Sequence, residues 1–335
     1  MKSNGRNPEV DVAKGIVILL MVVGHCYCQE NIILKLICAF HMPFFFIVTG
    51  YLTKENHTKI GGLLSKNSLI KTWIPYLGYS MLYGLLLYSI RSISSGCLEW
   101  NPLFQDLVKI VTLQGLSALW FIPCNFFARL IVVVINKYFS KAGFFLSAAI
   151  MLLGLCLDMP DTLTVFRRML VSIGFVATGY YGHEWIAEST KSGGVFCLCT
   201  ISFLFTGIVN SSVSMFANSY GNILLYYISS IAGTLMTFYA ATRLSEIKNE
   251  LYRILQYLGQ NTLIILGTHM LIVEIIRIVD NKLFDSVLPH LGLYEGIVFA
   301  SIVILLEIPV ICAINNYMPF LAGRKLKRKI SIDSL

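Results

Sequence analysis

Two histidines and a lysine interrupt the apolar N-terminal part of the chain, where ionisable side chains are costly. Lys14 and His25 lie in one apolar segment, and His41 lies beside Pro43 in the next. Lys14 and His25 are eleven positions apart, about three helical turns, so both are expected on one helix face roughly 16 Å apart along the axis. A charged residue at the middle of a membrane helix costs about 2.5–3.5 kcal/mol on the insertion scale, so such residues indicate a functional site.

Lys14 and His25 each have a purely structural interpretation as well. Lys14 near a helix end can extend its amine to the membrane surface. A neutral His25 can be satisfied by a neighbouring backbone carbonyl. Asp11 precedes Lys14 by three positions, so the two can pair on the helix surface and hold the direction of the lysine side chain.

The composition identifies a polytopic membrane protein. Of 335 residues, 56% are hydrophobic and only 13% are charged, and the mean hydropathy is +0.72, far from the values of soluble domains. The net charge of +8 comes from Lys and Arg in short segments between apolar runs, which indicates membrane orientation and lipid contact and excludes a nucleic-acid surface. Nine scattered cysteines predict neither a metal site nor a disulfide framework.

The apolar runs predict an all-α integral membrane bundle of about ten transmembrane helices, in a single domain over residues 1–335. Lys and Arg in the loops number 17 on the side of the N-terminus and 7 on the other side, which places both termini, including the basic tail at 323–335, in the cytoplasm. The predicted spans are 12–28, 32–53, 73–91, 116–136, 143–157, 163–182, 193–209, 222–243, 259–278 and 293–314.

Further polar positions lie on both sides of this bundle. Lys71 belongs to a basic cytoplasmic segment that either binds an anion or only sets the orientation, and Pro75 is expected near the start of the third span, where proline is tolerated. Arg129, in the middle of the fourth span, must face a partner or a cavity. On the outer side, 91–116 is expected to cover an opening, and 216–222 is expected to form a turn that contacts a polar ligand.

The motifs of this chain resemble those of membrane-bound acyltransferase family 3, and within it the branch of fucose 4-O-acetylase-like sugar O-acetylases. The resemblance covers nearly the whole chain. It rests on DVAKGI through GH at 11–25, FHMPFFF through GYL at 40–52, IPY at 74–76 and LWFIP at 119–123, with weaker matches at 174–180, at SYGN in 219–222 and at LGQNT in 258–262 through His269.

The resemblance implies an enzyme of the inner (plasma) membrane that moves an acyl group, usually acetyl, from cytosolic acyl-CoA to a hydroxyl of a cell-surface glycan or its lipid-linked precursor. Acetyl-CoA is then a co-substrate, and no tightly bound cofactor is implied. The partners are acyl-CoA, the acceptor and membrane lipids. The rival hypotheses are a non-catalytic carrier or flippase for a polysaccharide precursor and a structural subunit of an export complex.

The resemblance also assigns roles to residues. The family histidine corresponds to His25 and its paired cation to Lys14, with Asp11 beside it. Contacts to donor or acceptor are expected from His41, Lys71, Trp120, Arg129 and Asn261. The family's Arg-x-x-Arg pair corresponds to Ser68 and Lys71, so one cation of that pair is missing.

These roles define a reaction that the residue types support. Histidine titrates near neutral pH, so His25 can act as a general base toward an attacking hydroxyl or as a nucleophile that carries the acyl group as an acyl-imidazole. Arg129 and His41 are expected to stabilise the developing oxyanion or to steer His25. His269 is expected to make a structural hydrogen bond, and the sequence assigns no role to His183.

Overall fold

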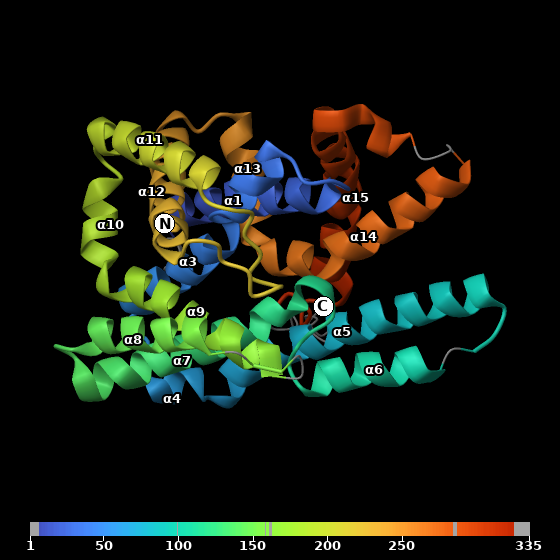
Figure 1. Ribbon diagram of the computed structural model, residues 1–335, viewed down its shortest axis with the longest axis horizontal. Helices are drawn as coiled ribbons and strands as arrows, with labels where there is room; N and C mark the ends of the chain where they lie inside the picture. The colour runs from blue at the N-terminus through green and yellow to red at the C-terminus, as the bar shows by residue number, and fades with distance from the viewer. Residues whose placement is uncertain (1–6, 99, 158, 161–162, 284–286, 325–335) are drawn as a thin grey trace, which may run out of the picture.

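The structure is a computed structural model that describes residues 7–98, 100–157, 159–160, 163–283 and 287–324, and this part of the chain is built from helices (Figure 1). Within it, the only β-type pairing is one bridge between Ser214 and Ser219. In chain order, the elements are α1 (Pro8–Cys26), α2 (Ile32–Cys38), α3 (His41–Glu55), α4 (Ile60–Leu63), α5 (Lys66–Ser95), α6 (Trp100–Val111), η1 (Ser117–Trp120), α7 (Phe121–Phe139), α8 (Gly143–Cys156), α9 (Thr164–Tyr181), α10 (His183–Ser189), α11 (Gly193–Val209), α12 (Ile223–Ile247), α13 (Glu250–Gln260), α14 (Thr262–Leu283), η3 (Leu288–Tyr294) and α15 (Glu295–Tyr317).

These helices confirm the all-helical prediction, and several of them are suited to a membrane. In the described part of the chain, five helical segments are long and apolar enough to span it, or six if the bent pair α10 and α11 counts as one span. The chain is therefore a multi-pass helical membrane protein. The count of ten spans and the cytoplasmic position of both termini stay predictions, and most of the basic tail at 323–335 lies outside the described residues.

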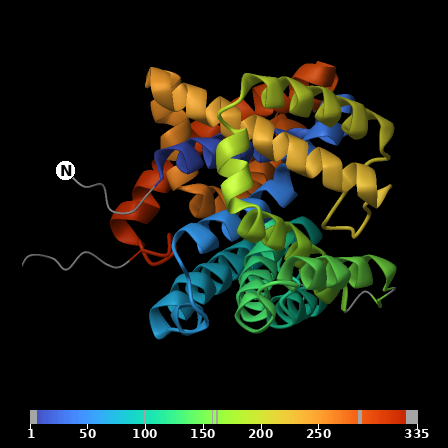
Figure 2. The same ribbon diagram turned by 90° about the vertical axis from the view of Figure 1, so that its left-hand side faces the viewer.

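The helices form two layers, which the two views show one above the other (Figures 1 and 2). Helices α5 to α9 make the lower layer, whereas α1 and α11 to α15 make the upper one. Helix α3 lies between them and contacts α9 below and α1 and α12 above. The interior between the two layers is therefore bounded by helices that are far apart in the sequence.

Helix α1 lies in the middle of the upper layer, against α12, α13 and α15. Its start is encoded locally, because Pro8 occupies the first turn and the Asn7 side chain accepts hydrogen bonds from the amides of Glu9 and Val10. Gly15 allows the backbone of α1 to approach that of α13, since a Cβ there would overlap the carbonyl oxygen of Leu255. This approach fixes the direction in which α1 projects its last turn.

Several helix boundaries differ from those predicted. The second predicted span, 32–53, contains α2 and α3, which together still form one candidate span at Ile32–Glu55, and a break at Asn261 separates α13 from α14 near the start of the predicted ninth span. The prediction that Pro75 lies near a helix start is wrong, because α5 begins at Lys66, where the Ser65 side chain accepts a hydrogen bond from the amide of Ser68. Pro75 is thus inside α5, and its missing N–H leaves the carbonyl of Lys71 without its helical donor.

The contact between α3 and α9 generates a stability prediction. A Cβ at Gly50 would overlap the carbonyl oxygen of Val176, and a Cβ at Gly179 would overlap that of Ile47. We expect Gly50→Ala or Gly179→Ala to lower the thermal unfolding midpoint in detergent, because forced overpacking costs about 1–3 kcal/mol.

Gly61→Ala is the matched control for this measurement. A Cβ at Gly61 meets no atom within 4 Å, so the midpoint should stay the same or rise slightly. Equal midpoints for all three variants would show that the contact between α3 and α9 does not limit stability.

Candidate functional site

Three pockets follow one another, and residues from both layers line the first of them. The Lys71 pocket has a volume of about 210 Å³ and the His25 pocket about 290 Å³, and Met21 and Met42 line both. The Arg168 pocket has a volume of about 280 Å³ and shares Ser117 and Phe216 with the His25 pocket. The His25 pocket is therefore the middle one of the three.

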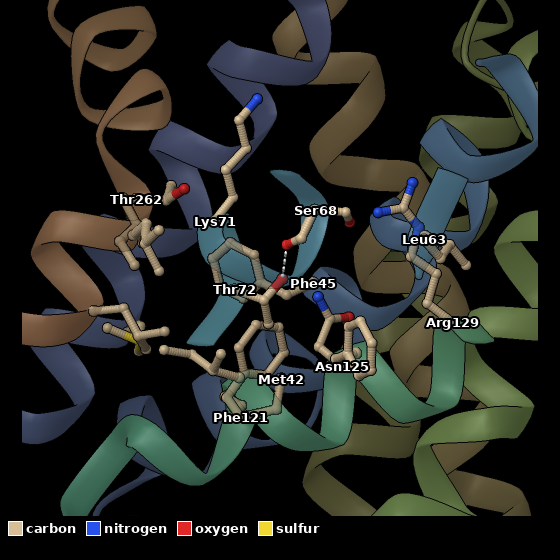
Figure 3. Close-up of a pocket in the computed structure, with 16 residues that line it drawn as sticks. Met42, Phe45, Leu63, Ser68, Lys71, Thr72, Phe121, Asn125, Arg129 and Thr262 are labelled. Atoms are coloured by element: carbon tan, nitrogen blue, oxygen red, sulfur yellow. Dashed lines mark hydrogen bonds between the residues drawn. The ribbon is translucent and has the colours of Figure 1, made fainter. Parts of the chain in front are cut away.

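The Lys71 pocket is polar at one end and apolar at the other. Lys71 and Arg129 lie in the upper part of the close-up, whereas Met42 and Phe121 lie in the lower part (Figure 3). The cations come from α5 and α7, and Ser68, one turn before Lys71, lines the same pocket. Both positions that correspond to the family's basic pair thus face this space.

Arg129 has partners, but they carry no charge. Its Nε donates to Thr53 Oγ1 at 2.7 Å and its Nη2 to Thr58 Oγ1 at 3.2 Å. These bonds meet the expectation that Arg129 faces a partner or a cavity, since it has both. Among the described residues, neither Lys71 nor Arg129 forms an ion pair with a carboxylate. Their charges are therefore available to an anionic ligand.

The last turn of α1 brings His25 to the middle pocket. The carbonyl of His25 accepts a hydrogen bond from Arg277 Nη2 at 3.1 Å, and a cation at this position stabilises a helix C-terminus. His41 lines the same pocket, and its Nδ1 donates to the carbonyl of Ile37 at 2.8 Å. In the neutral form of this tautomer, Nε2 of His41 carries a lone pair, so it can accept a hydrogen bond from a group in the pocket. Trp120 also lines the pocket, and its contact with donor or acceptor stays a prediction.

His269 of α14 lies next to His25, a contact that the sequence does not predict. The two ring centroids are 5.2 Å apart. Nδ1 of His269 donates to the carbonyl of Ile265 at 2.7 Å, which is the expected structural hydrogen bond. Its Nε2 is buried and has no hydrogen-bond partner among the described residues. A local signal for this pairing is absent, because the two histidines are 244 positions apart.

The other predicted site residues lie outside these pockets. Lys14 Nζ is 2.7 Å from Asp11 Oδ1, so the predicted ion pair is present, but neither residue lines any of the three pockets. Asn261 joins helices, since its Nδ2 donates to the carbonyl of Tyr257 at 2.8 Å and its Oδ1 accepts from Asn315 at 2.9 Å. Their predicted roles toward substrate stay predictions.

Two further histidines, His57 and His183, line none of the three pockets. His183 stacks on Tyr51 with a centroid separation of 4.3 Å, and His57 is exposed beyond the end of α3. Within the described part of the chain, no group of three His, Cys, Asp or Glu side chains is arranged to hold a metal ion. The chemical groups that the pockets offer are therefore imidazoles in the middle and cations at both ends.

Comparison with known families agrees with this arrangement. A family model described as an acyltransferase domain matches residues 7–315, a range that includes all three pockets. No curated protein and no solved structure gives a significant match. Because the family model covers nearly the whole sequence, the chain belongs to the acyltransferase 3 family and is a membrane acyltransferase that transfers groups other than aminoacyl groups.

Proposed function

We propose that this protein is an O-acetyltransferase of the fucose 4-O-acetylase-like branch in the inner (plasma) membrane. It moves an acetyl group from cytosolic acetyl-CoA to a hydroxyl of a cell-surface glycan or its lipid-linked precursor. The observation that carries this proposal is the junction of the Lys71 pocket and the His25 pocket at Met21 and Met42. This junction connects an anion-binding end on the predicted cytoplasmic side with a candidate base nearer the outer side.

The Lys71 pocket suits the donor. Coenzyme A carries phosphates, which Lys71 and Arg129 can bind as charge-assisted partners. The apolar end of the pocket, at Met42 and Phe121, suits the thioester arm and keeps water from it. Methionine side chains are flexible enough to let that arm pass into the His25 pocket.

In the His25 pocket, the reaction needs one proton to move. Nitrogen of the His25 ring takes the proton of the acceptor hydroxyl while its oxygen attacks the thioester carbonyl, and the C–S bond then breaks to leave the ester and the CoA thiolate. The protonated imidazole returns the proton to that thiolate. In the alternative route, a His25 ring nitrogen attacks the thioester carbonyl first and CoA thiolate leaves, which gives an acyl-imidazole. The hydroxyl then attacks this acyl group, the imidazole leaves, and the hydroxyl proton passes to the thiolate.

The first prediction concerns His25. In detergent, purified wild type should release CoA thiol from acetyl-CoA when envelope glycan is present, and His25→Ala should reduce this rate by about 10²–10⁴-fold, the usual contribution of general acid–base catalysis. His183→Ala is the control, because that histidine lines none of the three pockets. Acetyl-enzyme that accumulates without acceptor would select the acyl-imidazole route.

The two rival hypotheses predict different outcomes for thioester consumption and for glycan acetylation in cells. A carrier would move glycan precursor without consuming thioester, and a structural subunit would leave glycan acetylation unchanged in His25→Ala cells. Either result would overturn the proposed function.

The second prediction concerns the donor cations. We expect Lys71→Met to raise the KM for acetyl-CoA by about tenfold, equivalent to about 1.4 kcal/mol, with little change in kcat, because binding rather than chemistry is weakened. Arg129→Lys should raise it less. Ser68→Arg should lower it, because this change adds a second cation to the pocket.

Lys66→Met is the matched control, since Lys66 is an exposed residue of the same helix that lies outside the pocket. Lys14→Met tests whether the donor site extends to α1. An equal rise of KM in the Lys66 and Lys71 variants would indicate a general charge effect and refute the assigned donor pocket.

The third prediction concerns His269 as a positioning residue for His25. The free lone pair on Nε2 can accept a hydrogen bond from the protonated His25 ring after proton transfer. We expect His269→Leu to lower kcat by about 10–100-fold without changing the donor KM, and His269→Gln, whose amide oxygen can accept, to restore part of the rate. If both variants instead lose thermal stability and activity together, His269 has only a structural role.

A further inference from the structure

Arg168 is a buried cation that lacks hydrogen-bond partners at two of its nitrogens. The residue is 6% exposed, and its Nε and Nη1 make no hydrogen bond among the described residues. Its guanidinium lies 5.4 Å from the ring centroid of Trp120 and 4.6 Å from that of Phe216. Aromatic faces attract a cation but cannot accept its N–H hydrogen bonds as an oxyanion does.

The preceding residue of the same helix, Arg167, does have hydrogen-bond partners for its guanidinium. Its Nε donates to the carbonyl of Gly154 and its Nη2 to that of Leu155, each at 3.1 Å. These carbonyls belong to the last residues of α8, which lack helical donors. Arg167 therefore has hydrogen bonds that account for its position, whereas Nε and Nη1 of Arg168 have none within the described part of the chain.

The pocket around Arg168 has an excess of positive charge. Asp106 of α6 accepts from Arg91 Nη1 at 2.8 Å and lies 3.7 Å from Lys109 Nζ, so one carboxylate serves two cations. With Arg168, three cations and one carboxylate line this pocket, and three minus one leaves a formal charge of +2. Arg168 is the buried cation of this set, whereas the side chains of Arg91 and Lys109 are 35% and 48% exposed. An anion beside Arg168 would offset the cost of its uncompensated burial.

We propose that the Arg168 pocket binds an oxyanion of the acceptor, either a phosphate or a carboxylate, and that the enzyme therefore acts on an acidic or phosphate-linked sugar. The assignment to the acceptor rests on the proposed function. The pocket adjoins the His25 pocket at Ser117 and Phe216, so a sugar anchored by its anionic group can present a hydroxyl to His25. The exposed Phe216 ring, between the two pockets, suits the apolar face of that sugar.

Direct binding tests this proposal without acyl transfer. Purified protein in detergent is titrated calorimetrically with inorganic diphosphate, with glucuronate, and with glucose as the neutral comparison. We expect at least one of the anions to bind wild type, glucose to bind more weakly, and Arg168→Gln to weaken the anion by about tenfold or more. Binding of diphosphate alone indicates the phosphate linkage of a lipid-linked sugar, whereas binding of glucuronate alone indicates an acidic sugar.

Matched variants locate the binding event. Lys71→Met removes a cation from the donor pocket, so it should leave the Arg168-dependent component of anion binding unchanged. Lys109→Gln removes a half-exposed cation that already shares Asp106, so it should weaken that component by only about twofold to threefold. Arg168→Lys keeps a cation in place if the glutamine variant does not fold, and it should bind more weakly than wild type because lysine lacks the planar fork.

Two outcomes overturn the inference. The first is absence of anion binding by wild type, and the second is equal affinity in wild type and Arg168→Gln. Either result can occur in a protein that releases CoA thiol normally, which would leave the proposed function intact. Conversely, anion binding at Arg168 without thiol release would contradict the proposed function and retain the anion site.

Discussion

The main constraint on this molecule is that a polar group among apolar helices needs a partner or a cavity. Arg129 bonds to two threonine hydroxyls. Glu307 is fully buried on α15 and accepts from Thr268 Oγ1, at 2.9 Å to each carboxylate oxygen. Among the described residues, Nε2 of His269 and two guanidinium nitrogens of Arg168 have no hydrogen-bond partner. His269 lies beside His25 of the middle pocket and Arg168 lines the third pocket, so a ligand there can offset the cost of these unpaired groups.

The backbone packing that positions these groups depends on glycine. Gly15 lets α1 approach α13, and Gly50 lets α3 approach α9. Gly15 lies ten positions before His25 in α1, and Gly50 lies nine positions after His41 in α3. Helices α1 and α3 are therefore each fixed by a close backbone contact at their glycine, while the ends that carry the histidines border the middle pocket. Small residues serve this purpose well because they allow close backbone contact without losing side-chain packing elsewhere.

The order of the three pockets has a chemical consequence for an acyltransferase. Cations stand at the two outer pockets, where the anionic parts of two substrates can bind, and imidazoles stand in the middle one. Met21 and Met42, whose side chains are apolar and adaptable, lie where the Lys71 pocket meets the His25 pocket. In the proposed reaction, such a boundary would limit access of water to the thioester, so transfer to a bound hydroxyl would be favoured over hydrolysis.

Several features of this protein follow from the sequence by itself. Its composition requires membrane helices, and the three-residue spacing of Asp11 and Lys14 predicts their ion pair. These features depend on local helix geometry, which is the same in any fold. Helix α1 begins at Pro8, four residues before the predicted start of the first span. Only the tertiary structure decided the contact of His25 with His269, the membership of Arg129 in the Lys71 pocket and the position of Arg168 against the rings of Trp120 and Phe216. Each of them depends on how helices distant in the sequence pack, and helix periodicity carries no information about which faces of such helices will meet.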